Sequence, residues 1–182
     1  MSASRSAVPR LAGLTTVLDE HVDFQLDHTL EALQSPLVWK RFMDQDHIED
    51  QHIGDWVVEE TGIQHRHVKG VQSILGYRVS MNTRHSLHKN DETGHIHYFM
   101  RTDINLFGLS TETEIVLHPS ACKEKSRVKV AVKGSTMING QVVAQSSKAY
   151  KNLPAFIQDF HSTQEGEVVF DNVKDAEIKD AQ

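Results

Sequence analysis

The chain has 182 residues, 38% of them hydrophobic and 24% charged, which is the composition of an ordinary globular protein. One domain with a full core fits this length, and the net charge of −6 argues against a general nucleic-acid-binding surface. The single cysteine, Cys122, excludes an intramolecular disulfide, and no stretch approaches the roughly 20 apolar residues that cross a bilayer. We therefore expect a soluble protein, most simply a cytoplasmic one.

Residues 1–19 are predicted to form a flexible N-terminal arm. Pro9, Gly13 and Asp19 interrupt this segment, so it lacks the apolar centre of a signal peptide. It contains Ser and Arg with no acid before Asp19, a composition that leaves organelle targeting open. The folded domain is expected at residues 20–163.

The domain is predicted to begin with a strand at 21–27, where apolar and polar side chains alternate. Two short helices are expected next. The first has Ser35 as its N-cap and Pro36 at its first helical position, and the second covers 47–52.

A succession of strands should follow the two helices. The signals are short apolar runs or alternating segments, at 56–58, 63–71, 75–81, 96–106, 112–118 and 128–132. Residues 85–94 are predicted to be a polar loop. Because short turns separate these segments, we expect consecutive strands to pair in an antiparallel meander.

The hydrophobic period changes after Gly140, where apolar residues recur every three or four positions as far as Phe160. This pattern predicts a long helix with a kink near Asn152, because Pro154 cannot donate a backbone hydrogen bond. Residues 164–182 are predicted to be an acidic tail, with 168–170 as an apolar docking point.

The predicted fold class is α+β: a curved antiparallel sheet of six to seven strands wrapped on the long C-terminal helix, with two short helices after strand one. Over 20–163 this order resembles the START-like helix-grip (SRPBCC) superfamily. Within it, three features resemble the VASt-type sterol-handling domains: a strand then a helix between Phe24 and Phe42, Gly54-Asp-Trp56 before a strand, and the strand 96–107 ending in Leu-Phe-Gly. The resemblance implies a hydrophobic ligand, such as a sterol or another lipid, between sheet and C-terminal helix.

Strand parity and helical period select the side chains that should face this space. The ligand-binding candidates are Tyr77, Met81, Tyr98, Met100, Tyr150, Leu153, Phe156, Ile157 and, from an extended first strand, His28. Met suits an adaptable pocket and Tyr adds a polar end, although the same set could fill a solid core.

The twelve histidines raise the question of a metal. Two His-x-His pairs, His65/His67 and His95/His97, each project to one side of a predicted strand. No cysteine or well-placed carboxylate supports either pair, so we expect exposed histidines, no metal and no cofactor. A basic stretch at 123–133 could touch an anionic membrane surface or simply be a solvated face.

The leading hypothesis is a protein that binds or transports a hydrophobic small molecule, with no catalytic residue assigned. One alternative is a cyclase, dehydratase or isomerase on the same fold, using His28 with a Tyr phenol as acid and base. Another is a protein-interaction domain with a filled core.

Overall fold

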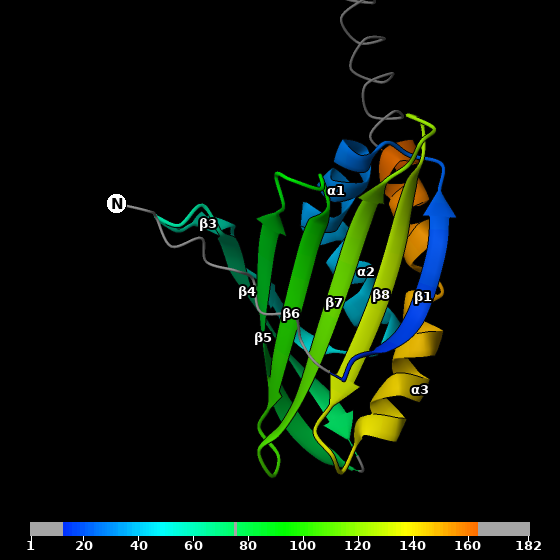
Figure 1. Ribbon diagram of the computed structural model, residues 1–182. Coiled ribbons are helices and arrows are strands. Elements are labelled where there is room, and N and C mark those ends of the chain that lie inside the picture. The colour runs from blue at the N-terminus through cyan, green and yellow to red at the C-terminus, as the bar shows by residue number, and fades with distance from the viewer. Residues whose placement is uncertain (1–12, 75, 164–182) are drawn as a thin grey trace, which may run out of the picture.

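The computed structural model describes residues 13–74 and 76–163 (Figure 1). The predicted acidic tail and its docking point at 168–170 lie outside the described residues. The elements in chain order are β1 (Thr15–Val22), α1 (Leu26–Gln34), α2 (Pro36–Gln45), β2 (Glu49–Ile53), β3 (Val57–Val58), β4 (Gln64–Ile74), β5 (Tyr77–Lys89), β6 (Ile96–Ile104), β7 (Leu109–Pro119), β8 (Ser126–Gly134) and α3 (Asn139–Tyr150).

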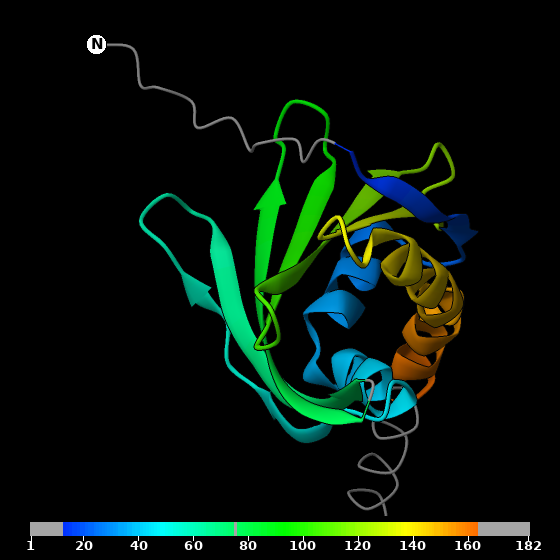
Figure 2. The same ribbon diagram turned by 90° about the horizontal axis from the view of Figure 1, so that it is seen from below.

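All strand pairs are antiparallel, in the order β1-β8-β7-β6-β5-β4-β2, with β3 pairing on β4. The sheet curls into a trough, and the helices lie on its concave side (Figure 2). The predicted α+β class and antiparallel meander are confirmed, and the arrangement is consistent with a helix-grip. The described sheet has eight strands, one more than the upper limit predicted.

Ser35 joins the two helices that cross one end of the trough. Its side chain accepts a hydrogen bond from the Leu37 N–H, and Pro36 occupies the start of α2, as predicted. The same residue is the C-cap of α1. Because Pro36 cannot continue the α1 hydrogen bonds, the chain turns here and starts a second axis.

The predicted helix pair is displaced along the chain. The segment 47–52 is not helical: it forms most of β2, because His47 (φ 54°) and Asp50 (φ 49°) adopt left-handed backbone conformations that interrupt a helix. The other helix of the pair is α1, which precedes α2 in the chain. Its residues had been predicted as the end of the first strand and as a connection. The strand is β1, which begins at Thr15 within the predicted arm.

The loop predicted at 85–94 is also shorter than expected. Residues 85–89 continue β5, with His85 and Leu87 buried on the concave face. The turn itself is closed by the Asn90 side chain, which accepts hydrogen bonds from the N–H groups of Glu92 and Thr93.

The predicted break in the C-terminal helix is confirmed. α3 ends at Tyr150, residues 151–152 form a turn, and a second helical segment occupies 153–163. Pro154 lies in the first turn of this segment, where its missing N–H needs no intrahelical partner.

The core fills the trough beneath the helices at the α1 end. Its fully buried members come from α1, the central strands and the C-terminal helical segment, and include Leu33, Ile115, Leu117, Val130, Leu153 and Ile157. The other end of the trough is not filled in the same way, and this difference creates the site.

Candidate functional site

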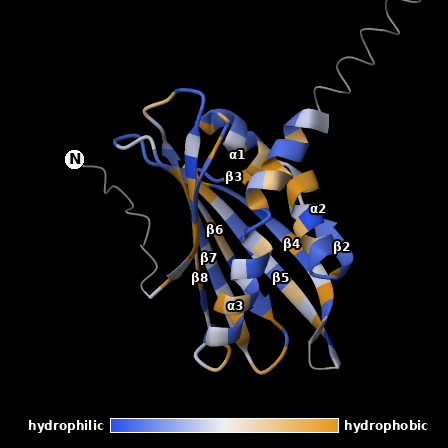
Figure 3. Ribbon diagram, turned by 90° about the vertical axis from the view of Figure 1, so that its right-hand side faces the viewer, coloured by the Kyte–Doolittle hydropathy of each residue, from blue (hydrophilic) through white to orange (hydrophobic). Residues whose placement is uncertain are grey.

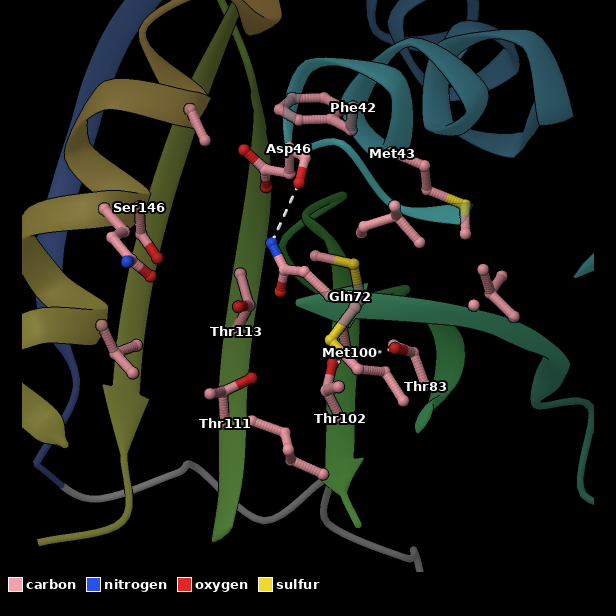
Figure 4. A pocket seen from close by; sticks show the side chains of 18 of the residues that line it. Phe42, Met43, Asp46, Gln72, Thr83, Met100, Thr102, Thr111, Thr113 and Ser146 are labelled. Atoms are coloured by element: carbon pink, nitrogen blue, oxygen red, sulfur yellow. Dashed lines mark hydrogen bonds between the residues drawn. The ribbon is translucent and has the colours of Figure 1, made fainter. Parts of the chain in front are cut away.

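A cavity of about 380 Å³ lies between the concave face of the sheet and the helices α2 and α3 (Figure 4). β4 to β7 form its floor, α2 with Ile48 forms one wall, and α3 forms the other. Its volume falls in the range of small-molecule sites. The cavity exists because α3 packs mainly on β8 and β1, so the strands that form the floor are not covered by it.

A band of hydroxyl groups crosses the cavity floor. Thr83, Thr102 and Thr111 are paired in register on β5, β6 and β7, and Thr113 follows one row along β7. The Oγ1 atoms of Thr83 and Thr102 are 2.9 Å apart and hydrogen bonded. Ser146 faces this band from α3 (Figure 4). The floor can therefore both donate and accept hydrogen bonds.

Apolar and aromatic side chains surround this band. Met81, Met100, Ile104 and Leu109 line the floor on either side of the threonines. Thioether side chains adapt their shape to irregular ligands, so this lining suits an apolar molecule.

An aromatic cluster closes the cavity at the α2 end. The ring of Phe42 lies 5.4 Å from that of Trp39, 5.2 Å from that of Tyr150 and 5.0 Å from that of Phe156. Burial raises the pKa of the Tyr150 phenol, which stays neutral, while the Thr113 side chain opposes that shift.

Asp46, the C-cap of α2, brings the one carboxyl group to the cavity lining in the described structure. The residue is exposed on its outer side, but partial burial of its carboxyl group raises the pKa, while a hydrogen bond from Gln45 lowers it. Its backbone carbonyl accepts a hydrogen bond from the Gln72 side chain at 3.0 Å, which ties α2 to β4 (Figure 4).

A buried polar chain runs from the end of α1 to the cavity wall. Gln34, the last residue of α1, has a carbonyl that accepts hydrogen bonds from Arg66 (2.8 Å) and Trp56 (3.0 Å). Arg66 also donates to the Tyr98 hydroxyl at 3.2 Å, and this hydroxyl lies 2.6 Å from His85 Nδ1. His85 lines the cavity.

Arg66 is only 2% exposed and makes no ion pair among the described residues. Its charge is stabilised instead by the partial negative charge at the end of α1 and by the Trp56 ring, which lies 4.6 Å from the guanidinium carbon. Its Nε is buried without a hydrogen-bond partner in the described residues.

His85 is neutral in this environment. Burial lowers its pKa well below the usual value, and the neighbouring charges of Arg66 and His67 act in the same direction. Burial also raises the pKa of Tyr98, so the phenol keeps its proton.

The structure brings three of the predicted ligand-binding residues, Met81, Met100 and Tyr150, together on the cavity wall. Leu153 and Ile157 are fully buried in the core beside the cavity, and Tyr98 lies behind His85. Phe156 packs on Phe42 at the closed end.

Two predicted residues lie elsewhere. Tyr77 is 63% exposed, because it is the first residue of β5 after the Gly76 turn, where the sheet is uncovered. His28 is exposed on α1, not on a strand, and its carbonyl oxygen is 3.1 Å from His161 Nε2. It does not share the cavity with a tyrosine, so the acid–base pair suggested for an enzyme does not form.

The ligand-binding prediction missed the polar lining residues and also apolar ones, among them Phe42, Ile48 and Leu109. The threonines and His85 continue the inward parity of Val79 and Met81 along β5 and its neighbours, and this parity could have identified them. His85 instead fell within the loop predicted at 85–94, and the threonines were not selected as ligand-binding residues.

The His-x-His pairs lie mainly on the outer face of the sheet. His65 pairs with Glu59 at 3.1 Å and His97 with Glu114 at 2.9 Å, whereas the rings of His95 and His118 contact each other. Within the described residues, no group of three or more His, Cys, Asp or Glu is arranged to hold a metal ion.

The comparisons with known proteins reach only the level of overall shape. No family model and no curated protein matches the sequence. Similar solved structures include a protein from Thermus thermophilus (14% identity, TM-score 0.48, 78% of this chain and 95% of that one) and Ara h 8.0201 (15%, 0.47, 81% and 99%). A conserved protein from Geobacillus kaustophilus is also similar, with 9% identity and a TM-score of 0.46, and the match covers 78% of this chain and 93% of that one. Similarity this low says nothing about function.

Proposed function

We propose that this protein binds and carries one small hydrophobic molecule that bears a few polar groups. The observation that supports this proposal is the cavity, whose lining combines apolar side chains such as Met81 and Met100 with a band of threonine hydroxyl groups and with the side chains of Gln141 and Gln145 on α3. Apolar burial supplies affinity at about 25 cal/mol per Å² removed from water, and the hydroxyl groups select the orientation.

The cavity volume narrows the ligand class. About 380 Å³ lies near the lower end of the range for small-molecule sites. A fused-ring or single-chain amphiphile suits this space better than a lipid with two acyl chains. A sterol-like or single-chain ligand is therefore the form of the lipid-binding hypothesis that the geometry supports best.

We further propose that the ligand is exchanged at the end of the trough where the β6–β7 and β8–α3 turns meet. Hydrogen bonds between Ser110 and Ser135 join these turns, and the lining residues Leu109 and Ile138 stand beside them. The turns at this end contain hydrophobic segments (Figure 3). Phe107 belongs to the β6–β7 turn.

Phe107 is 87% exposed and Met137 88% exposed, and we call these two residues the apolar rim. Apolar side chains of peripheral proteins bury in the boundary between headgroups and acyl chains, and we propose the rim as the membrane contact on this basis.

The basic stretch at 123–133 is a weaker candidate for this contact. Arg127 is paired with Asp19 at 2.6 Å and Lys125 with Asp23 at 2.7 Å. These acids offset part of the positive charge that would attract anionic lipids. In the described residues no helix has the length and apolar character needed to cross a bilayer.

A pair of matched variants tests the binding proposal. Ser146 lines the cavity, whereas its neighbour Ser147 is exposed on α3 and does not. Ser146→Trp should occupy part of the cavity and weaken binding of N-phenyl-1-naphthylamine, an apolar fluorophore, at least about tenfold, which corresponds to losing about 1.4 kcal/mol. Ser147→Trp should bind as the wild type does. Equal binding by both variants, or none by the wild type, would contradict the proposal.

A further inference from the structure

We propose that His85 is a fixed hydrogen-bond donor in the cavity and that the ligand presents a neutral carbonyl oxygen to it. This inference rests on the proposed binding function and adds the chemical group that the site recognises. It is carried by the buried chain Arg66–Tyr98–His85.

The chain of hydrogen bonds determines which nitrogen of His85 carries the proton. Arg66 can only donate, so the Tyr98 oxygen accepts from it at 3.2 Å. The phenol proton then needs an acceptor, and His85 Nδ1, 2.6 Å away, is the one that the hydrogen bonds of the described residues provide. Nδ1 is therefore unprotonated, and the neutral ring carries its proton on Nε2.

The position of Tyr98 determines which edge of the ring is left for the ligand. Tyr98 is fully buried and lies behind the cavity wall, whereas His85 is part of that wall. The edge with Nδ1 thus faces the core. The opposite edge, which carries Nε2–H, remains for the cavity. The ring of Trp39, which also lines the cavity, makes a T-shaped contact with the His85 ring, with 4.8 Å between the ring centres.

The chemical class of the ligand group follows from this fixed proton. Nε2–H can donate but cannot accept, so its partner must be an acceptor. A carbonyl oxygen fits best, since it has no proton that would need a second partner. A carboxylate is less suitable, because Arg66 already has the end of α1 and the Trp56 ring as its charge partners.

Two neutral naphthalene fluorophores separate this inference from the binding proposal. One, 6-propionyl-2-(dimethylamino)naphthalene, has a carbonyl group, and N-phenyl-1-naphthylamine has none. The variant His85→Asn keeps an oxygen near the position of Nδ1 to accept from Tyr98, but it ends short of Nε2. It should weaken binding of the carbonyl probe about two- to tenfold, the loss of one hydrogen bond, and leave the other probe unchanged.

The outcomes are distinct. An unchanged ratio of the two affinities in His85→Asn would overturn the role of His85 while leaving the binding proposal intact. If the wild-type protein binds neither probe, the proposed function fails and this inference fails with it.

The tautomer can be measured without relying on a variant. Long-range ¹H–¹⁵N correlation spectra of the wild-type protein should show His85 with a pyridine-type Nδ1 and a pyrrole-type Nε2. In Tyr98→Phe, the ring should lose this fixed tautomer. A protonated Nδ1 in the wild type would contradict the proposal, whether or not His85→Asn folds.

Discussion

At the scale of single residues, the buried polar chain is the unusual feature of this protein. Arg66 is held in the interior by a helix end, an indole ring and a phenol, where a carboxylate would be the common partner. In this arrangement the Tyr98 hydroxyl is the hydrogen-bond partner of both Arg66 Nη2 and His85 Nδ1, and no other described group bonds to these two nitrogen atoms. The link between Arg66 and His85 in the interior therefore depends on the hydroxyl oxygen of Tyr98.

Removing that oxygen should be costly. Tyr98→Phe leaves His85 Nδ1 and one Arg66 N–H buried without a partner, and we expect a loss of about 1–3 kcal/mol in the free energy of unfolding, measured by urea denaturation. The control is Tyr77→Phe, which removes a hydroxyl from a 63% exposed ring and should change stability by less than about 0.5 kcal/mol. Similar values for the two variants would show that the buried hydroxyl contributes nothing.

Acid should destabilise the protein through His85. The pKa of His85 is about 6.5 in the unfolded chain and lies well below 6.5 in the folded protein. At a pH between the folded-state and unfolded-state pKa, the unfolded chain therefore binds a proton that the folded chain does not. Stability is then full above about pH 6.5 and falls by about 1.4 kcal/mol per pH unit as the pH decreases toward the folded-state pKa. His118 acts in the same direction, because burial lowers its pKa too.

The measurement is the free energy of unfolding at pH 7.5, 6.5 and 5.5. His85→Asn cannot titrate, so its stability should decline less than that of the wild type over this range. Parallel curves for the two proteins would mean that His85 does not bind protons differently in the folded and unfolded states.

Side-chain parity predicted part of the cavity. Met100 and Tyr150 lie on the cavity wall, the side toward which strand alternation and helical period direct them, because these patterns depend only on local geometry. Whether an inward residue lines a cavity, as Met81 does, or fills the core, as Ile157 does, depends on how far the opposing helix stands from the floor. The sequence pattern carries no measure of that distance.

At the scale of elements, the approach of the α2–β2 connection to the sheet shapes one side of the cavity. Ile48 packs directly over Gly70 of β4, and a Cβ atom at Gly70 would stand 2.3 Å from Ile48 Cγ2 and 3.0 Å from Met43 Cε. The backbone of Gly70 has no positive φ, so a glycine is needed here for lack of space and not for backbone conformation. A side chain at this position would displace the side chain of Ile48 from the sheet.

Gly70→Ala should therefore destabilise the fold by about 1–3 kcal/mol, the usual cost of overpacking. The matched control is Gly140→Ala in the first turn of α3, where a Cβ atom meets nothing within 4 Å. That variant should be neutral or up to about 1 kcal/mol more stable, because alanine favours a helix. Calorimetric melting temperatures that fall equally in both variants would contradict this account.

The elements with a sustained period were the ones predicted best. The long strands β6 to β8 and the C-terminal helix with its break follow from alternation, helical spacing and Pro154. α1 was missed although Leu26, Leu30 and Leu33 have helical spacing, because the period-2 pattern just before it was extended too far. β2 depends on pairing with β4, a long-range contact that no local pattern encodes.

At the scale of the whole molecule, the trough is closed at one end by aromatic side chains and carries the apolar rim at the other. The order of elements in the sequence predicted the curved sheet. The rim could not be predicted in this way, because it depends on which side chains of the turns are left unpacked by other elements. Phe107 lies in the β6–β7 turn with a left-handed backbone (φ 52°), and its side chain is exposed.

The rim should govern contact with membranes. Phe107→Ser combined with Met137→Ser should reduce sedimentation with phosphatidylcholine vesicles several-fold, since two large apolar side chains no longer enter the interface. Leu37→Ser, which removes a 54% exposed leucine from α2, is the control and should have little effect. Binding that requires anionic lipid and is unaffected by the double variant would instead assign the contact to the basic stretch.

The central claim is that the cavity holds a small hydrophobic molecule, and native mass spectrometry tests it most directly. The protein would be purified without detergent from the organism that makes it, and any bound molecule would be extracted and identified. We expect one molecule per chain, with a fused-ring or single-chain skeleton and a carbonyl group, and a depleted complex in Ser146→Trp but not in Ser147→Trp. A chain that is empty, and whose melting temperature does not rise with any of a panel of sterols, single-chain lipids and aromatic ketones, would contradict the claim.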